Sequence, residues 1–257
     1  MADVHHTTKP SERRGLFWPA VFVLVALPVL IGLGVWQVER LQWKEALIAS
    51  INEGLAQPAV PLEQPRDAWK DLSTREYRPV TVMGRFRHED ERHLFATDHG
   101  EMGWYIYTPL ETQGGHIVFV NRGFVPDALK APSSRAAGEI TGEVTVSGLM
   151  RLPGVKGFFD ADADQVRNVW LWRDLAGMTG SLPEGDRARV LPFFVDAAVE
   201  PANPGGWPRG GVTRLDIPNR HLEYALTWFG LAVTLVAVFA AFAWPRLRQS
   251  KGPASPE

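Results

Sequence analysis

The stretch Asn219-Arg220-His221-Leu222-Glu223-Tyr224-Ala225-Leu226-Thr227-Trp228 opens the last hydrophobic run of the chain, and this run decides the fold. No charged side chain appears in the 21 residues from Tyr224 to Trp244. A helix of that length crosses a hydrocarbon core of about 30 Å. The sequence therefore predicts a transmembrane helix, with its polar entrance, over residues 219–244.

A histidine and a tryptophan mark the entrance of this helix. His221 and Trp228 are seven residues apart, which places them on one helical face with a rise of about 10.5 Å between them. Imidazole is a standard axial ligand of haem iron, and an indole two turns away can flank such a ligand. The alternative is an interface histidine that hydrogen-bonds to lipid headgroups or to backbone.

The same helix carries a stripe of small residues. On an ideal helix Gly230, Thr234, Ala237 and Ala241 share one face, and small residues allow close helix–helix contact in lipid. His221 and Trp228 lie on the opposite face, together with Leu235 and Phe239. If the small stripe packs on another span, the His–Trp face points away from that span.

A second apolar run lies near the start of the chain. It extends over the 23 residues 16–38, which is longer than the core of a signal peptide, and no clear cleavage site ends it. We expect a first transmembrane helix at 16–38 that continues as a helix to about residue 54. Trp36, Arg40 and Trp43 share one face of it, at the height of lipid headgroups.

Basic residues flank the two runs on their outer sides: Lys9, Arg13, Arg14, Arg246, Arg248 and Lys251. By the positive-inside rule, residues 1–15 and 245–257 are cytoplasmic tails. Residues 55–218 then lie outside the cytoplasm, which in a bacterium is the periplasm. The sequence predicts a multi-pass protein of the bacterial inner (plasma) membrane.

The region 55–218 reads as a mainly β domain. Short segments rich in β-branched and aromatic residues alternate with turn residues, and Gln113-Gly114-Gly115 is a good hairpin turn. Expected strands cover residues 78–86, 103–108, 116–125, 142–152, 169–173 and 190–195. The fold class is therefore a membrane protein in which two transmembrane α-helices flank an antiparallel sandwich or small barrel.

Composition removes several function classes. The chain has no cysteine, so thiolate metal sites, disulfides and cysteine nucleophiles are absent. Its formal net charge of -2 offers no basic patch suited to nucleic acid. No nucleophile elbow, phosphate loop, dinucleotide fingerprint or zinc-protease motif occurs, and we expect no enzyme activity and no catalytic residues.

Two groups of polar residues in the β domain are weaker candidates. Arg122 ends a hydrophobic strand and can meet an anionic group such as a propionate, although such an arginine more often pairs with a carboxylate of its own protein. His88, His93 and His99 lie within twelve residues. A polar hairpin is favoured there over a histidine-based metal site.

Four motifs in order resemble the Surfeit locus protein 1 family. They are Leu33-Gly34-Val35-Trp36-Gln37-Val38-Glu39-Arg40-Leu41-Gln42-Trp43-Lys44, Tyr77-Arg78-Pro79-Val80 with Gly84 and Phe86, Val120-Asn121-Arg122-Gly123-Phe124-Val125-Pro126, and Asn219 to Phe229. With the two expected spans, the resemblance covers essentially the whole chain. Phe124 stands where members often carry tryptophan, which is a conservative difference.

The resemblance implies a function in the assembly of cytochrome c oxidase. Bacterial members are similar to chaperones that bind haem a and assist its insertion into subunit I, and His221 and Trp228 match the residues implicated there. The implied partners are oxidase subunit I, haem a synthase and membrane lipid, with no metal other than haem iron on His221. The alternatives are a cofactor-free scaffold for oxidase subunits and a metal carrier that uses His88, His93 and His99.

Overall fold

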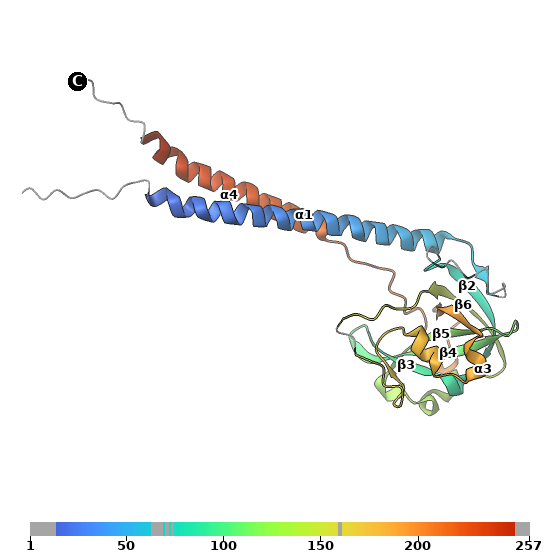
Figure 1. The fold of residues 1–257 in the computed structure, drawn as a ribbon. Coiled ribbons are helices and arrows are strands. Elements are labelled where there is room, and N and C mark those ends of the chain that lie inside the picture. Colours follow the sequence, from blue (N-terminus) through green and yellow to red (C-terminus); the bar gives the residue numbers. More distant parts are fainter. Residues whose placement is uncertain (1–13, 63–68, 70–71, 73–74, 159–160, 250–257) are drawn as a thin grey trace, which may run out of the picture. The chain divides into compact units, whose positions relative to one another are not determined.

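A computed structural model describes residues 14–62, 69, 72, 75–158 and 161–249 (Figure 1). The chain divides into a helical unit, from residues up to Ile48 and from Ile217 onward, and a β-rich unit, Ala49–Asp216. Lys9, Arg13 and Lys251, on which the expected orientation partly depends, lie outside the described residues.

Two helices are long and apolar enough to cross a membrane, α1 (Arg14–Ala56) and α4 (His221–Gln249). At 1.5 Å per residue α1 extends for roughly 65 Å, about twice the thickness of a hydrocarbon core. None of the 18 residues in its most apolar part is buried, and only 11% are buried in that of α4. A core helix of a soluble protein has the opposite exposure, so these helices match transmembrane helices.

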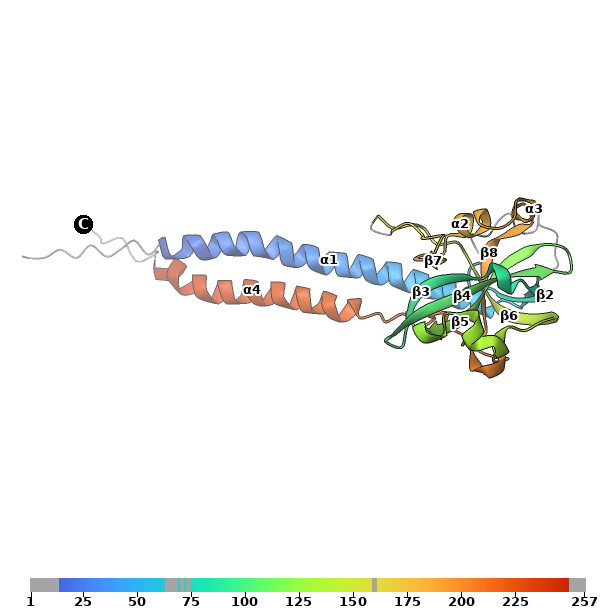
Figure 2. The ribbon, with the colours of Figure 1, turned by 90° about the horizontal axis from the view of Figure 1, so that it is seen from below.

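Within the helical unit, α1 and α4 lie side by side, as the two views agree (Figures 1 and 2). Ala225, Ala232 and Ala243 are the buried residues of α4. They recur at spacings of seven and eleven residues, which keeps them on one helical face. On α1, Gly34 is buried and its backbone meets the ring of Phe229.

The expected packing face of α4 is therefore wrong. Gly230, Thr234, Ala237 and Ala241 are all exposed, whereas the helix packs through the alanine stripe on its opposite side. Gly34 of α1 allows the two helices to approach closely, and Phe229 of α4 occupies the space above it. The His–Trp face adjoins this contact and does not point away from α1.

The β-rich unit is built on a closed ring of five strands. In ring order these are β2 (Pro79–Phe86), β6 (Glu143–Arg151), β8 (Val190–Ala197), β5 (Ile117–Pro126) and β4 (Glu101–Thr112). The end of β4 pairs with the end of β2 and closes the ring. Closure removes unpaired strand edges, and the interior is filled by side chains such as Val82, Leu110, Val120 and Phe193.

Shorter elements extend this ring. β3 (Arg92–Asp98) pairs with the first half of β4, β7 (Val169–Trp170) pairs with β3, and β1 (Val60–Pro61) pairs with β2. The short helices are η2 (His88–Asp90), η3 (Asp127–Leu129), η4 (Pro132–Gly138), α2 (Leu175–Gly180), α3 (Glu184–Arg187) and η5 (Pro204–Gly206).

The expected fold class is confirmed, with the small barrel as the form of the β domain. The hairpin turn at residues 113–115 is also confirmed, since it joins β4 to β5. The ring is not wholly antiparallel, because β5 and β8 pair in parallel. The segment 169–173 forms a two-residue strand only, and β3 was not among the expected strands.

Candidate functional site

The first residue of α4 is tied to α1 by a side-chain hydrogen bond. His221 Nδ1 lies 2.6 Å from Oε1 of Gln37. Gln37 is a polar side chain in a mainly apolar helix and is only 8% exposed, so this contact satisfies a buried group. With the amide oxygen as acceptor, Nδ1 carries the proton and donates, which leaves the lone pair on Nε2.

Trp228 lies two turns into α4 on the side of His221. Both side chains are half-buried, next to the buried Ala225. Lys44 Nζ donates to the carbonyl of Pro218 at 2.5 Å, a second polar tie just before α4 begins. The structure thus places His221 and Trp228 on one face beside α1, and a ligand on this face would meet residues of both helices.

The sequence pattern gave no prediction for Gln37, which stands between Trp36 and Val38. Its neighbours were assigned to a headgroup-level face, and Trp36 and Trp43 are indeed exposed. The guanidinium of Arg40 stacks on Trp43 at 4.0 Å from the ring centroid. The available signal was an uncharged polar residue one turn from Gly34 in an apolar run.

Arg122 lies in the β-rich unit and is enclosed there, with an exposed fraction of 1%. Nη2 donates to the Gly138 carbonyl and to Oδ1 of Asn203 (3.2 Å), and Nη1 lies 3.6 Å from Oε1 of Glu139. The guanidinium also stacks over the ring of Phe86. These contacts match the second interpretation given above, an arginine paired with a carboxylate of its own chain.

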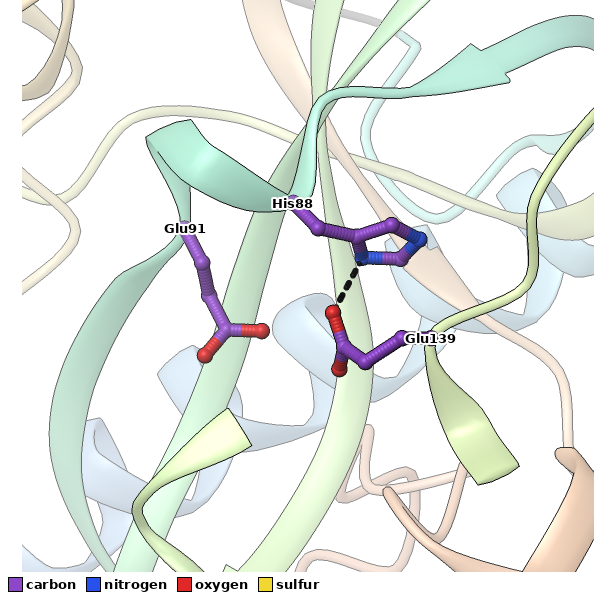
Figure 3. Close-up of side chains that lie close together, drawn as sticks. All are labelled: His88, Glu91 and Glu139. Carbon is purple, nitrogen blue, oxygen red and sulfur yellow. Dashed lines mark ion pairs between the residues drawn. The ribbon is translucent and has the colours of Figure 1, made fainter. Parts of the chain in front are cut away.

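Around Arg122 lies a polar cluster that includes His88, Glu91 and Glu139 (Figure 3). His88 Nδ1 is 2.7 Å from Oε2 of Glu139, and the other ring nitrogen lies 2.9 Å from the Ile140 carbonyl. Burial lowers the pKa of His88, but the hydrogen bonds to Glu139 and Ile140 outweigh it and raise the pKa above its ordinary value. Burial raises the pKa of Glu139, and His88, Arg122 and Arg135 together lower it below its ordinary value.

The cluster has nitrogen and carboxylate oxygen atoms of the kinds that bind a cation, but two arginine side chains already contact these atoms. Potential ligand atoms of His88, Glu91 and Glu139 lie within 4.8 Å of one another. Arg135 bonds to both carboxylates, at 2.6 Å from Oε1 of Glu139, and Arg122 adds a second positive charge. Two guanidiniums balance two carboxylates, so a metal ion would add unpaired positive charge.

The three histidines of the metal-carrier alternative have different surroundings. His88 contacts Glu139, and His93 Nε2 lies 2.7 Å from Oε1 of Glu91, so both belong to the polar cluster. His99 sits at the turn between β3 and β4 with a side chain that is 88% exposed, and its ion pair is with Asp98. The expected polar hairpin is present, formed by β3 and β4.

Comparison with known proteins identifies the family of this chain. The family model described as "SURF1 family" matches residues 24–233. The chain belongs to the SURF1 family. It is 37% identical to Surfeit locus protein 1 of Homo sapiens over 246 residues, which are 88% of this chain and 76% of that protein.

Other relatives are as similar over more of their length. A SURF1-like protein of Monosiga brevicollis is 34% identical over 267 residues, covering 98% of this chain and 95% of that protein. Surfeit locus protein 1 of Takifugu rubripes is 35% identical over 242 residues, covering 86% and 95%. The resemblance stated from the four motifs is thereby confirmed.

The structure gives each SURF1-family motif in this chain a physical role. In the first, Gly34 and Gln37 make the two contacts to α4 described above. In the second, Gly84 lies where the ring closes, and a side chain there would collide with the Glu111 carbonyl of β4.

In the third motif, consecutive residues of β5 serve opposite faces. Arg122 joins the polar cluster, whereas the Asn121 amide donates to Oδ1 of Asp196 at 3.0 Å. Gly123 has a φ of 126°, and the backbone of Arg209 crosses directly over it. Only glycine can adopt that φ and also tolerate another backbone segment so close to its Cα atom. The motif therefore supports the fold of the barrel.

Proposed function

We propose that this SURF1-family chain is a non-catalytic assembly factor for cytochrome c oxidase that binds haem a and assists its insertion into subunit I. The oxidase and the haem come from the family resemblance. The observation that carries the proposal is the hydrogen bond between His221 Nδ1 and Gln37, since Nε2 of this half-buried imidazole then has a lone pair and no hydrogen-bond partner among the described residues.

The residues at the head of the helix pair suit such a ligand. Haem supplies an iron whose axial positions accept an imidazole nitrogen. Gln37 fixes the tautomer and the ring orientation of His221, as outer partners of ligating histidines generally do. Trp228 offers an apolar ring beside the same face. Because His221 and Trp228 are half-buried, they contact one side of the ligand and leave its other side accessible to a partner protein.

Arg122 has no part in this proposal. Its guanidinium is enclosed by Gly138, Asn203 and Glu139, and freeing it for a propionate would leave the Glu139 carboxylate with one fewer cation. The proposed haem contacts are those of His221 and Trp228, with Gln37 as the positioning residue.

The proposed setting follows from the two helices and the flanking charges. Both termini lie in the cytoplasm of a bacterium, the barrel lies in the periplasm, and α1 and α4 cross the inner membrane. The proposed partners are subunit I, haem a synthase as the donor of the cofactor, and membrane lipid.

The test is a His221→Ala variant purified from cells that make haem a. We expect the wild-type chain to carry a haem absorption spectrum, and the variant to lose most of the haem per mole of folded protein. His99→Ala is the matched control, because it removes a histidine that is 88% exposed and forms its ion pair, among the described residues, with Asp98. Equal haem content and equal spectra in all three proteins would overturn the ligand assignment.

A Gln37→Ala variant separates ligation from positioning. The imidazole remains but its tautomer is no longer held, so we expect bound haem with a shifted spectrum and faster loss to apomyoglobin. The rival function is a scaffold that holds subunit I without a cofactor. Wild-type protein that is purified without haem and still co-purifies with subunit I would favour that rival.

A further inference from the structure

The β-rich unit contains an open cavity of about 550 Å³ that the proposed function does not use. Its floor is a row of neighbours across three strands, because Tyr107 of β4 pairs with Asn121 of β5, and Asn121 pairs with Asp196 of β8. The segment 212–214 forms one side. A cavity of this size suits a small organic molecule.

The floor of the cavity is polar, and the charges of its side chains compensate one another. The Asp196 carboxylate is buried and accepts from Asn121 at 3.0 Å, from Arg151 at 3.0 Å and from Thr213 at 2.7 Å. Arg151 also lies 3.3 Å from Glu76, which is outside the lining. The one carboxylate of the cavity is thus neutralised by the protein itself and leaves no demand for a cation.

Two further arginines line the cavity without a carboxylate. Across the described residues, neither Arg173 nor Arg214 forms an ion pair, and Arg214 donates only to the carbonyl of Thr97 at 2.9 Å. The cavity therefore has an excess of two positive charges. Arginine is the usual partner of carboxylate and phosphate groups, through two parallel N–H bonds.

The walls are aromatic. Phe95, Tyr105 and Trp172 line the cavity with these arginines. Burial and the charge of Asp196 raise the pKa of Tyr107 well above its ordinary value, and the charges of Arg173 and Arg151 act against this rise. Burial and the charge of Asp98 raise the pKa of Tyr105, and the charge of Arg214 acts against that rise. Apolar rings next to unpaired cations are complementary to a flat molecule that carries anionic groups.

We propose that this cavity binds an organic anion, one or two carboxylate or phosphate groups on a planar apolar body, with Arg173 and Arg214 holding the charge and Tyr105 and Trp172 the ring. The site lies wholly within the β-rich unit and does not depend on His221. A phospholipid headgroup shares the anionic group with such a molecule but lacks the planar ring, so the two sources can be distinguished.

The test uses the full chain in phosphatidylcholine nanodiscs, titrated with naphthalene-2,6-dicarboxylate by calorimetry. We expect saturable binding, and at least tenfold weaker binding by Arg173→Gln/Arg214→Gln. Arg167→Gln is the matched control, since Arg167 is 83% exposed and outside the lining, and it should bind like the wild type. If the double variant fails to fold, the single variant Arg214→Gln takes its place. It alters an exposed residue and should also bind the dicarboxylate more weakly than the wild type.

Two further probes sharpen the outcome. The uncharged naphthalene-2,6-dimethanol should bind at least tenfold more weakly than the dicarboxylate, and inorganic phosphate should compete poorly. Equal affinity of the arginine variants, of the uncharged probe or of phosphate would overturn the proposal. Nanodiscs that contain phosphatidylglycerol identify the source: loss of dicarboxylate binding would assign the site to a phospholipid headgroup and overturn the contact with a planar ring, and unchanged binding assigns the site to a free planar anion.

Discussion

Phe229 of α4 lies over Gly34 of α1, so that a Cβ atom added to Gly34 would stand 2.6 Å from the phenyl ring. On α1 this contact lies one turn from Gln37, which bonds to His221, and on α4 it lies between Ala225 and Ala232 of the alanine stripe. Gly32, two residues earlier, has nothing within 4 Å of the same added atom. The two glycines therefore form a matched pair for measuring helix contact.

Gly34→Ala should loosen the helix pair. The methyl group forces the ring of Phe229 or the helices apart, at a cost of about 1–3 kcal/mol, whereas Gly32→Ala should be neutral or slightly stabilising. Unfolding of the purified chain in mixed micelles of sodium dodecyl sulfate measures this. Phe229→Leu in the Gly34→Ala background should recover part of the loss. Equal effects of the two glycine substitutions would contradict the packing.

Gly123→Ala should be severe in the barrel. Alanine would have to adopt a φ of 126° and collide with the Arg209 backbone, so we expect a loss of roughly 3–5 kcal/mol, or no folded protein. Gly100→Ala is the control, since Gly100 has a φ of 85° with open space around it. It should cost about 1–2 kcal/mol, the backbone strain alone. Thermal melts of both variants provide the comparison, and similar melting temperatures would refute the role of the crossing strand.

Arg122→Met should destabilise the fold rather than remove a ligand contact. The Gly138 carbonyl and the Glu139 carboxylate lose a buried cation, which typically costs about 3–5 kcal/mol. Arg167→Met, at an exposed ion pair, should cost less than about 1 kcal/mol. If Arg122→Met melts like the wild type yet binds less haem per folded chain, the residue serves a ligand after all.

The His88–Glu139 pair should make stability depend on pH. A histidine whose pKa is raised on folding stabilises fully below its unfolded value of about 6.5, and this contribution is lost as pH rises through the folded value. Glu139, with a lowered pKa, loses its contribution only at acid pH. The melting temperature should therefore fall from pH 6 to 8.5 in the wild type and in His99→Gln. The fall should be smaller in His88→Gln, and an unchanged slope there would contradict the assignment.

Much of the architecture was predictable from local pattern. The uncharged run from Tyr224 to Trp244 and the run 16–38 are long enough to identify two spans without any tertiary information. The turn at residues 113–115 fixes a hairpin by its glycines. These features depend on neighbours in sequence, and the structure contains them at α4, α1 and β4–β5.

The rest depends on residues that are far apart. The packing face of α4 was predicted from small residues alone, but Gly34 on the other helix decides it. The end of α1 at Ala56 agrees with the expected end at about residue 54, but the sequence does not show that the backbone at Gly54 meets the Glu76 carbonyl. Arg135 and Glu91 are 44 residues apart, so the polar cluster that encloses Arg122 has no local signature.

The parallel pairing of β5 with β8 has a consequence for how the protein is made. Because β8 is the neighbour of both β5 and β6, the ring stays open until Val190–Ala197 has been synthesised. The next helix, α4, begins at His221, only 24 residues beyond Ala197. Closure of the barrel and insertion of the second span thus fall close together in time. Until β8 is made, one edge of β5 and one edge of β6 have no strand partner, and this is the interval in which the nascent chain most needs protection from aggregation.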